Sequence, residues 1–347
     1  MAINIDLLRE LCLTPGAPGH EAEIRKVVLR EIEPLVDSWE VDPMGNVIAI
    51  KKGKSRKKVM AAAHLDEISF IITHLDAKGF GYFHTLGGFD PKTLTAQRVI
   101  VHGKKDVIGV MGSKPIHIMT PEERQKAPKL KDYFIDFGMP GEEVKKWVSI
   151  GDVVTRERDL VELGDCVSTK SLDNRVSVYI LIETLRKLKD PAWDFYAVFT
   201  VQEEVGLRGA TTSTRKINPD AGFGLDVTIA NDLPGAQEHE YITLLGKGTA
   251  IKIMDGSVIC DPRMVSFMEE IAKSFEIPYQ KEVLTGGGTD TGALQRSGEG
   301  AIVGCISIPS RHIHSVVEMC HKEDIQHSID LLTHCVEQLD RLQTTWQ

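Results

Sequence analysis

Several apolar, strand-like runs in this sequence end abruptly at His, Asp or Glu, and this feature most constrains the possible fold. The run from Met60 to Ala63 leads directly into His64, Asp66 and Glu67. Similar apolar runs precede three further groups of metal-capable side chains: Glu203 with Glu204, Asp226, and His312 with His314. In open α/β sheets, functional sites form at the carboxyl ends of the strands. The runs therefore predict one composite site at one edge of a sheet.

Helical and strand-like patterns alternate along most of the chain. Apolar residues recur at helical spacing near the N-terminus, for example at Ile24, Val28 and Ile32. We expect helices at 5–13, 19–36, 173–189, 206–215, 261–275, after Thr289 and at 322–343, and strands at 45–52, 58–63, 195–202, 221–226 and 301–308. This alternation is typical of a mostly parallel sheet flanked by helices. The expected fold class is therefore α/β.

Residues 73–164 lack this alternation. They contain short β-type runs at 98–102, 107–111 and 133–137, with many Gly and Pro residues between them. Such runs and turns are typical of a small β-barrel. We expect an inserted, barrel-like β domain at 73–164, within a catalytic domain that consists of residues 1–72 and 165–347.

Composition and charge exclude several classes of protein. The net charge of −9 argues against a dedicated nucleic-acid or membrane binder. The basic run 51–58 is interpreted as a solvated hairpin turn. No run approaches the roughly 20 apolar residues that a membrane span needs. The six scattered cysteines contain no Cys-x-x-Cys pair, which indicates free, mostly buried thiols in a reducing compartment. We therefore expect a cytoplasmic protein.

The residue types at the strand ends suit a hydrolytic metal site. Such a site needs His nitrogen and carboxylate oxygen ligands, and two neighbouring metals need a shared carboxylate. The candidate ligands are His64, Asp173, Glu204, Asp226 and His314. With five such groups, each metal could have one His and one carboxylate of its own and share the remaining carboxylate.

Three of these assignments have alternatives on sequence alone. Asp173 lies at the start of an expected helix, where an aspartate more often caps the helix. His312 and His314 are two residues apart, so spacing does not choose between them. Glu203 and Glu204 point in opposite directions on an extended strand, but a turn there would let one bind metal and the other act as a general base.

Five segments carry a resemblance to a known family. They occur in the family's order and are Ala63–Ile68, Ser171–Arg175, Val201–Gly206, Gly224–Asp226 and Ser310–Ser315. In these segments the chain resembles the tetrahedral aminopeptidases, also called glutamyl or deblocking aminopeptidases, some of which are labelled endoglucanases. The likeness covers nearly the whole chain and includes two segments of the insert, 109–115 and 134–138.

The resemblance implies a fold of the metallo-exopeptidase type and two divalent metal ions per subunit. Zinc or cobalt is expected, with manganese as a further option. By matching motif, Asp173 bridges the two metals. His64 and Asp226 complete one metal site, and Glu204 and His314 complete the other.

The resemblance also implies the remaining roles. Glu203 is the general base, and Asp66 is the catalytic partner that orients His64. The family selects His314 as the ligand, because it usually has Tyr where His312 stands. A loop at 285–292 is expected to form a wall of the active site.

The expected activity is hydrolysis of N-terminal residues from short peptides. The resemblance further implies a homo-oligomer, a dodecamer, in which the insert contributes to dimerisation and substrate access. Two other functional classes stay open. A glycoside hydrolase uses two carboxylates and usually no transition metal, which would leave His64 and His314 without a role. A non-catalytic scaffold is disfavoured because all five candidate ligands and Glu203 are present.

Overall fold

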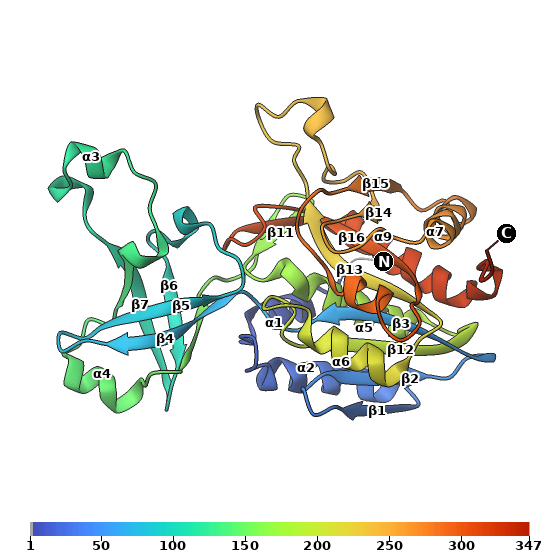
Figure 1. The fold of residues 1–347 in the computed structure, drawn as a ribbon, viewed down its shortest axis with the longest axis horizontal. Coiled ribbons are helices and arrows are strands. Elements are labelled where there is room, and N and C mark those ends of the chain that lie inside the picture. The colour runs from blue at the N-terminus through green and yellow to red at the C-terminus, as the bar shows by residue number, and fades with distance from the viewer. Residues whose placement is uncertain (1–2, 347) are drawn as a thin grey trace.

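A sheet of eleven strands forms the larger part of the molecule, and a smaller β-barrel extends from it (Figure 1). The computed structural model describes residues 3–346. The spatial order of the main path is β1 (Ser38–Val41), β2 (Val47–Lys51), β12 (Trp193–Thr200), β3 (Ser55–His64), β13 (Ala221–Ile229), β16 (Ile302–Arg311), β17 (Glu318–His321), β11 (Cys166–Thr169) and β10 (Val161–Leu163). Off this path, β14 (Thr249–Met254) pairs with β16 and with β15 (Tyr279–Val283).

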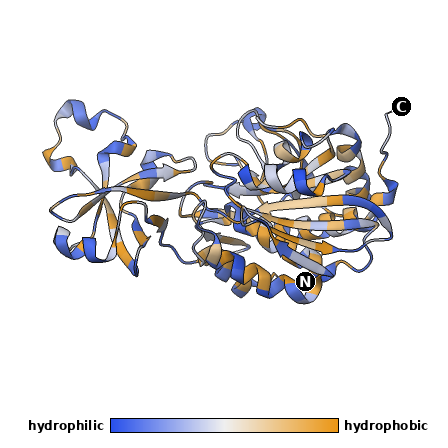
Figure 2. Cartoon of the chain, turned by 60° about the horizontal axis from the view of Figure 1, so that its bottom comes forward, coloured by the Kyte–Doolittle hydropathy of each residue, from blue (hydrophilic) through white to orange (hydrophobic). Residues whose placement is uncertain are grey.

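The centre of this sheet is parallel and its margins are antiparallel. Strands β12, β3, β13 and β16 are parallel neighbours, so their carboxyl ends lie at the same edge. These strands are the expected apolar runs, which is typical of parallel strands that are buried on both faces. Figure 2 shows hydrophobic colouring along the strands at the centre of the larger domain. The α/β fold class is confirmed, with a mixed sheet around a parallel core.

Two groups of helices pack on the sheet. In the first group, α5 (Leu172–Lys187) lies against β3 and β13, and it also contacts α1 (Ile5–Leu13), α2 (Ala22–Ile32) and α9 (Lys322–Glu337), while α7 (Pro262–Ser274) contacts α9. In the second group, α6 (Arg208–Ile217) and α8 (Asp290–Gln295) pack against each other and on the strands. Because sheet and helices enclose α5, most of its residues are buried.

The insert forms a closed antiparallel barrel of six strands. Its strands are β4 (Ser69–Leu75), β5 (Phe80–Leu86), β8 (Tyr133–Asp136), β7 (Asp106–Ser113), β6 (Arg98–His102) and β9 (Val153–Arg156), in spatial order. The barrel has a core of its own, which includes Phe70, Val101 and Ile135. The inserted barrel is confirmed. The expected boundaries at 73 and 164, and the role of the insert in dimerisation, stay predictions.

Short elements complete the chain. Two further helices belong to the insert, α3 (Pro121–Arg124) and α4 (Gly141–Trp147). The 3₁₀ turns are η1 (Glu33–Leu35), η2 (Pro91–Leu94), η3 (Ile116–Ile118), η4 (Leu130–Asp132), η5 (Glu238–Glu240) and η6 (Leu339–Arg341). All six cysteines are free thiols, and five of them are buried. Within residues 3–346 we find no helix that is both long and apolar enough to cross a bilayer.

One local interpretation from the sequence is wrong. The basic run 51–58 does join β2 to β3, and none of its residues is buried. The two strands do not form a hairpin, however, because β12 lies between them and pairs with both. The neighbour of β2 in the sheet is therefore β12, which comes more than a hundred residues later in the chain, and not β3.

Candidate metal centre

The carboxyl ends of the central strands open into a cavity of about 720 Å³. Six of its lining residues are the expected ligands and base: His64, Asp173, Glu203, Glu204, Asp226 and His314. They come from the ends of β3 and β13, the start of α5, and the segments that follow β12 and β16. The structure therefore brings together side chains that are separated by up to 250 positions in the sequence.

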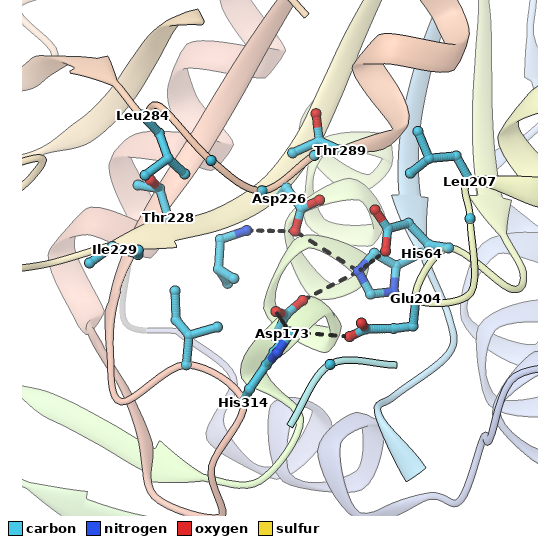
Figure 3. Close-up of a pocket in the computed structure, with 18 of the residues that line it drawn as sticks. His64, Asp173, Glu204, Leu207, Asp226, Thr228, Ile229, Leu284, Thr289 and His314 are labelled. Carbon is cyan, nitrogen blue, oxygen red and sulfur yellow. Dashed lines mark hydrogen bonds and ion pairs between the residues drawn. The ribbon is translucent and has the colours of Figure 1, made fainter. Parts of the chain in front are cut away.

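Asp173 lies between the two histidines of this cluster (Figure 3). Its Oδ1 is 3.3 Å from Nε2 of His64, and its Oδ2 is 3.3 Å from Nε2 of His314. Each histidine has a second carboxylate nearby: Asp226 Oδ1 is 3.9 Å from His64 Nε2, and Glu204 Oε1 is 3.6 Å from His314 Nε2. The carboxylate of Asp173 thus faces two halves of the cluster: His64 with Asp226, and His314 with Glu204.

The side chain of Asp173 does not cap the helix that begins beside it. Although α5 begins at Leu172, Asp173 has the non-helical angles φ −75° and ψ 104°. The structure shows no side-chain capping bond at this helix start among the residues it describes. The carboxylate instead points into the cavity, towards both histidines.

A turn after β12 positions the two glutamates. Strand β12 ends at Thr200, Gln202 has a positive φ of 55°, and the amides of Gly206 and Leu207 both donate to the carbonyl of Glu203. The turn brings Glu203 and Glu204 onto the same cavity. Oε2 of Glu203 lies 3.8 Å from Nε2 of His64, on the Asp226 half of the cluster.

Asp66 contacts His64 most closely through its backbone carbonyl, and its carboxylate has other partners as well. Nδ1 of His64 contacts the backbone carbonyl of Asp66 at 3.1 Å, and the carboxylate of Asp66 is farther away, at 3.5 Å. The same carboxylate accepts hydrogen bonds from the amides of Glu203 and Glu204, at 2.9 and 3.0 Å. Asp66 therefore ties the end of β3 to the turn that carries both glutamates.

Glu318 is a residue of this site that the sequence analysis missed. It is 1% exposed, and its carboxylate accepts hydrogen bonds from the amides of Asp173 and His314, each at 2.9 Å. It thus holds the backbones of two candidate ligands, as Asp66 does for the candidate base Glu203 and the candidate ligand Glu204. Glu318 lies four residues after His314, at the start of β17, and an acidic residue within the apolar run 316–320 is the signal that could have identified it.

The barrel also contacts one of the candidate ligands. Arg156, at the end of β9, is 1% exposed and donates from Nη1 to the backbone carbonyl of His314 at 3.3 Å. The segment Gly88–Asp90 lines the same cavity. Across the cavity, Gly286–Thr289 form part of the wall, as expected for the glycine-rich loop. His312 is exposed and absent from the lining, whereas His314 lines the cavity.

The carboxylates lie so close together that they oppose one another's ionisation. Burial, followed by the charge of Asp173, raises the pKa of Glu204 to about 8. Burial, together with neighbouring carboxylates, also raises the pKa of Glu203 and the pKa of Asp226 well above their usual values. Asp173 differs: burial would raise its pKa, but the two histidines hold that pKa below its usual range. The cluster therefore contains more carboxylates than groups that can carry a positive charge.

The donor set fits divalent cations. One nitrogen or oxygen from each of His64, Asp173 and Glu204 lies within 4.8 Å of the others, and His64, Glu203 and Asp226 form a second such group. Oε1 of Glu204 is buried and has no hydrogen-bond partner among the residues described. Imidazole and carboxylate ligands suit zinc, cobalt and manganese. Because Glu203 belongs to the second group, geometry alone permits it as a ligand or as a base.

Comparisons with known proteins agree with this geometry. A family model described as M42 glutamyl aminopeptidase matches residues 45–331. The lysyl aminopeptidase of Pyrococcus furiosus is 33% identical over 99% of both chains. The structure of aminopeptidase APDkam598 from Desulfurococcus kamchatkensis is 39% identical, with a TM-score of 0.93, and the match covers 96% of this chain and 94% of that one.

A further similar structure concerns assembly. The TET1 peptidase of Pyrococcus horikoshii is 31% identical with a TM-score of 0.87, and the match covers 96% of this chain and 99% of that one. That peptidase is described as able to assemble into a tetrahedron or a large octahedral shell.

Proposed function

Because this chain belongs to the M42 glutamyl aminopeptidase family, we propose that it hydrolyses the N-terminal peptide bond of short peptides at the cluster around Asp173. Family membership makes it an aminopeptidase and a peptide-bond hydrolase. The observation that carries the proposed mechanism is the position of Asp173, whose two carboxylate oxygens each face one histidine at 3.3 Å.

We propose that Asp173 would help to hold both of two divalent metal ions. His64 and Asp226 would hold one ion, and Glu204 and His314 would hold the other. When bound, such a pair lowers the pKa of a coordinated water and polarises the scissile carbonyl. Asp66 and Glu318 keep the ligand-bearing backbones in place, since each accepts two hydrogen bonds from the amides of these residues.

Glu203 is the proposed general base. It lines the cavity beside His64, and its backbone is held by Asp66. Its carboxylate takes a proton from the attacking water while a C–O bond forms at the scissile carbon. It then gives the proton to the leaving nitrogen as the C–N bond breaks. A positioned carboxylate of this kind contributes roughly 10²- to 10⁴-fold to the rate.

Carboxylates outside the proposed ligand set suit the action on chain ends. The free N-terminal amine of a peptide is cationic near neutral pH and can pair with Glu203 or Asp90, which line the cavity but are not proposed as ligands. An internal peptide segment offers no such charge. We therefore propose exopeptidase rather than endopeptidase activity.

We also propose that the chain acts as a homo-oligomer, up to a dodecamer. The structure of PhTET1-12s, which is 30% identical over 96% of this chain, is described as a dodecamer, and the Pyrococcus horikoshii relative can assemble into a tetrahedron or a large octahedral shell. The barrel presents an apolar surface of Ile108, Val110, Ile116 and Ile118, which are 47–67% exposed. A second copy of the chain is the proposed occupant of this surface. The negative net charge and the free cysteines support a cytoplasmic protein without nucleic-acid or membrane partners.

Chelation tests the metal dependence of the proposed activity. Hydrolysis of aminoacyl-nitroanilides should disappear after dialysis against a chelator and return on addition of zinc, cobalt or manganese. Elemental analysis of the dialysed protein confirms that the metal has been removed. Full activity in a sample shown to be metal-free would contradict the proposal, and hydrolysis of carboxymethylcellulose by that sample would indicate a glycosidase instead.

A further inference from the structure

One side of the active-site cavity is lined mainly by apolar side chains. Thr228, Ile229 and Leu284 lie together on the side of Asp226 that faces away from His64 (Figure 3). Val227 and Ile313 also line the cavity. We call Val227, Thr228, Ile229, Leu284 and Ile313 the side wall. Ile229 is 42% exposed, and Leu284 and Ile313 are half-buried, so apolar surface is open to a ligand.

Among the described residues that line the cavity, Lys252 is the one lysine, and there is no arginine. Its side chain is 1% exposed, and its ammonium is already paired twice. Nζ lies 3.1 Å from Oδ2 of Asp255 and 2.9 Å from Oε1 of Glu282, and both of these carboxylates are fully buried. Thr228 holds the second partner, because its hydroxyl donates to Oε1 of Glu282 at 2.7 Å.

This arrangement disfavours an acidic ligand side chain. Lys252, Asp255 and Glu282 together carry a net charge of −1 if all three are ionised. A further carboxylate would find one ammonium on this side of the cavity, and that ammonium already has two carboxylate partners. A desolvated carboxylate without a partner of its own costs several kcal/mol.

A basic side chain is disfavoured for a different reason. Asp255 and Glu282 are absent from the cavity lining, and both already pair with Lys252. A lysine or arginine ligand would therefore find no accessible carboxylate of this trio beside the apolar side wall. Asp90 lines the cavity as well, but it is exposed, and its carboxylate accepts from the amide of Lys92.

From these contacts we infer that the side wall holds the N-terminal side chain of the substrate and selects aliphatic residues such as Leu, Ile and Met over Glu and Lys. The inference rests on the proposed function and adds the preferred substrate class to it. Burying an aliphatic side chain against the wall favours binding and leaves no unpaired charge. Leu207, on the opposite side of Figure 3, is also aliphatic.

A substrate panel tests the preference. The metal-loaded enzyme is assayed with Leu-, Met-, Glu- and Lys-aminomethylcoumarin at equal metal concentration. We expect kcat/KM for Leu and Met to exceed that for Glu and Lys by at least about tenfold, the size of discrimination that pocket contacts provide. Glu or Lys substrates turned over as fast as Leu would overturn the inference. Failure to hydrolyse any aminoacyl substrate would instead contradict the proposed function, and the preference with it.

Variants of Ile229 test the side wall itself. Ile229→Lys should raise the ratio of Glu to Leu turnover about tenfold, and Ile229→Glu should raise the ratio of Lys to Leu turnover similarly, because each adds a partner for the charged side chain. Ile259→Lys is the matched control, since Ile259 is 68% exposed and lies outside the cavity lining. Unchanged ratios in folded, metal-loaded Ile229 variants would show that this wall does not contact the N-terminal side chain.

Discussion

At the scale of single residues, the candidate site is organised around the carboxylate of Asp173. Asp173 contacts both histidines at 3.3 Å, and two buried acids outside the proposed ligand set hold the surrounding backbone amides. Asp66 holds Glu203 and Glu204, while Glu318 holds Asp173 and His314. The roles of ligand, base and positioning residue can therefore be separated by single substitutions.

Glu203→Gln separates the roles of base and ligand for Glu203. The amide keeps the shape of the side chain but cannot take a proton, so kcat should fall by about 10²- to 10⁴-fold. If Glu203 is the base, metal content measured by elemental analysis stays at the wild-type value. A variant that loses metal along with activity would assign Glu203 to the ligands, and unchanged activity would exclude both roles.

Glu318→Gln tests the positioning role of Glu318. The carboxamide offers one oxygen and one NH₂ group where two amides now donate, so one of the two hydrogen bonds at 2.9 Å is lost. We expect the metal dissociation constant, measured by competition with a chelator, to rise about 10- to 100-fold. Activity should return at saturating metal.

Glu142→Gln is the control for this variant, because the side chain of Glu142 is 86% exposed. Wild-type metal affinity in Glu318→Gln would show that the two hydrogen bonds do not influence the metal ligands.

At the scale of elements, the site depends on a buried ion pair that joins the end of β3 to the start of α5. Glu67 accepts from Nζ of Lys170 and from Oγ of Ser171, each at 2.6 Å, and Nη2 of Arg175 lies 3.8 Å from its carboxylate. All of these groups are buried. The contact places Lys170 and Ser171, and therefore Asp173 shortly after them, beside the strand end that carries His64.

Glu67→Gln should lower the free energy of unfolding by about 3–5 kcal/mol, because Lys170 would remain buried without a counter-charge. Burial opposes ionisation of both partners: it lowers the pKa of Lys170 against the attraction of Glu67. For Glu67, burial would raise the pKa, but Lys170 and Arg175 prevail and hold that pKa below 4.5. The ionised carboxylate therefore stabilises the folded state above about pH 4.5, and this contribution is lost as pH falls through the lowered pKa.

Urea unfolding at pH 7 and near pH 4 measures this effect. The difference between the wild type and Glu67→Gln should be large at pH 7 and smaller at the lower pH. Glu142→Gln should show less than about 1 kcal/mol at either pH, because its partner Lys145 is also solvent-exposed. An equal difference at both values of pH would contradict an ionised role for Glu67.

At the scale of the whole molecule, the barrel is attached to the catalytic domain on one side and exposed on the other. Arg156 and the segment 88–90 bring it to the cavity. Strand β7 alternates between buried and exposed residues, and Ile108 and Val110 are among the exposed ones. An apolar outer face on a barrel that already has its own core indicates a protein contact.

Ile108→Lys should disrupt the proposed oligomer, because Ile108 is 63% exposed and a charge in an apolar contact lacks a partner. Light scattering should give the wild type a mass several times the 38.5 kDa of one chain, up to twelvefold, and give the variant a smaller mass. Ile259→Lys is again the control. A wild type that is monomeric at micromolar concentration would refute the proposed assembly.

Much of this protein can be read from the sequence alone, because local patterns carry the information. The apolar runs that end in His, Asp or Glu predicted the parallel core of the sheet and the edge at which the site forms. The change of pattern after residue 72 predicted the barrel. Strand order is different: β12 enters between β2 and β3, although nothing in the basic run 51–58 indicates it.

The tertiary structure decided which of several equivalent side chains reach the site. Spacing left His312 and His314 open, and the backbone after β16 turns only His314 into the cavity. Glu318 and Arg156 are involved because folding brings β17 and the barrel against the ligand-bearing segments. Residue type and local period determine which chemistry is available and where strands end. Contacts between distant segments depend on packing, and packing determines which of those groups meet.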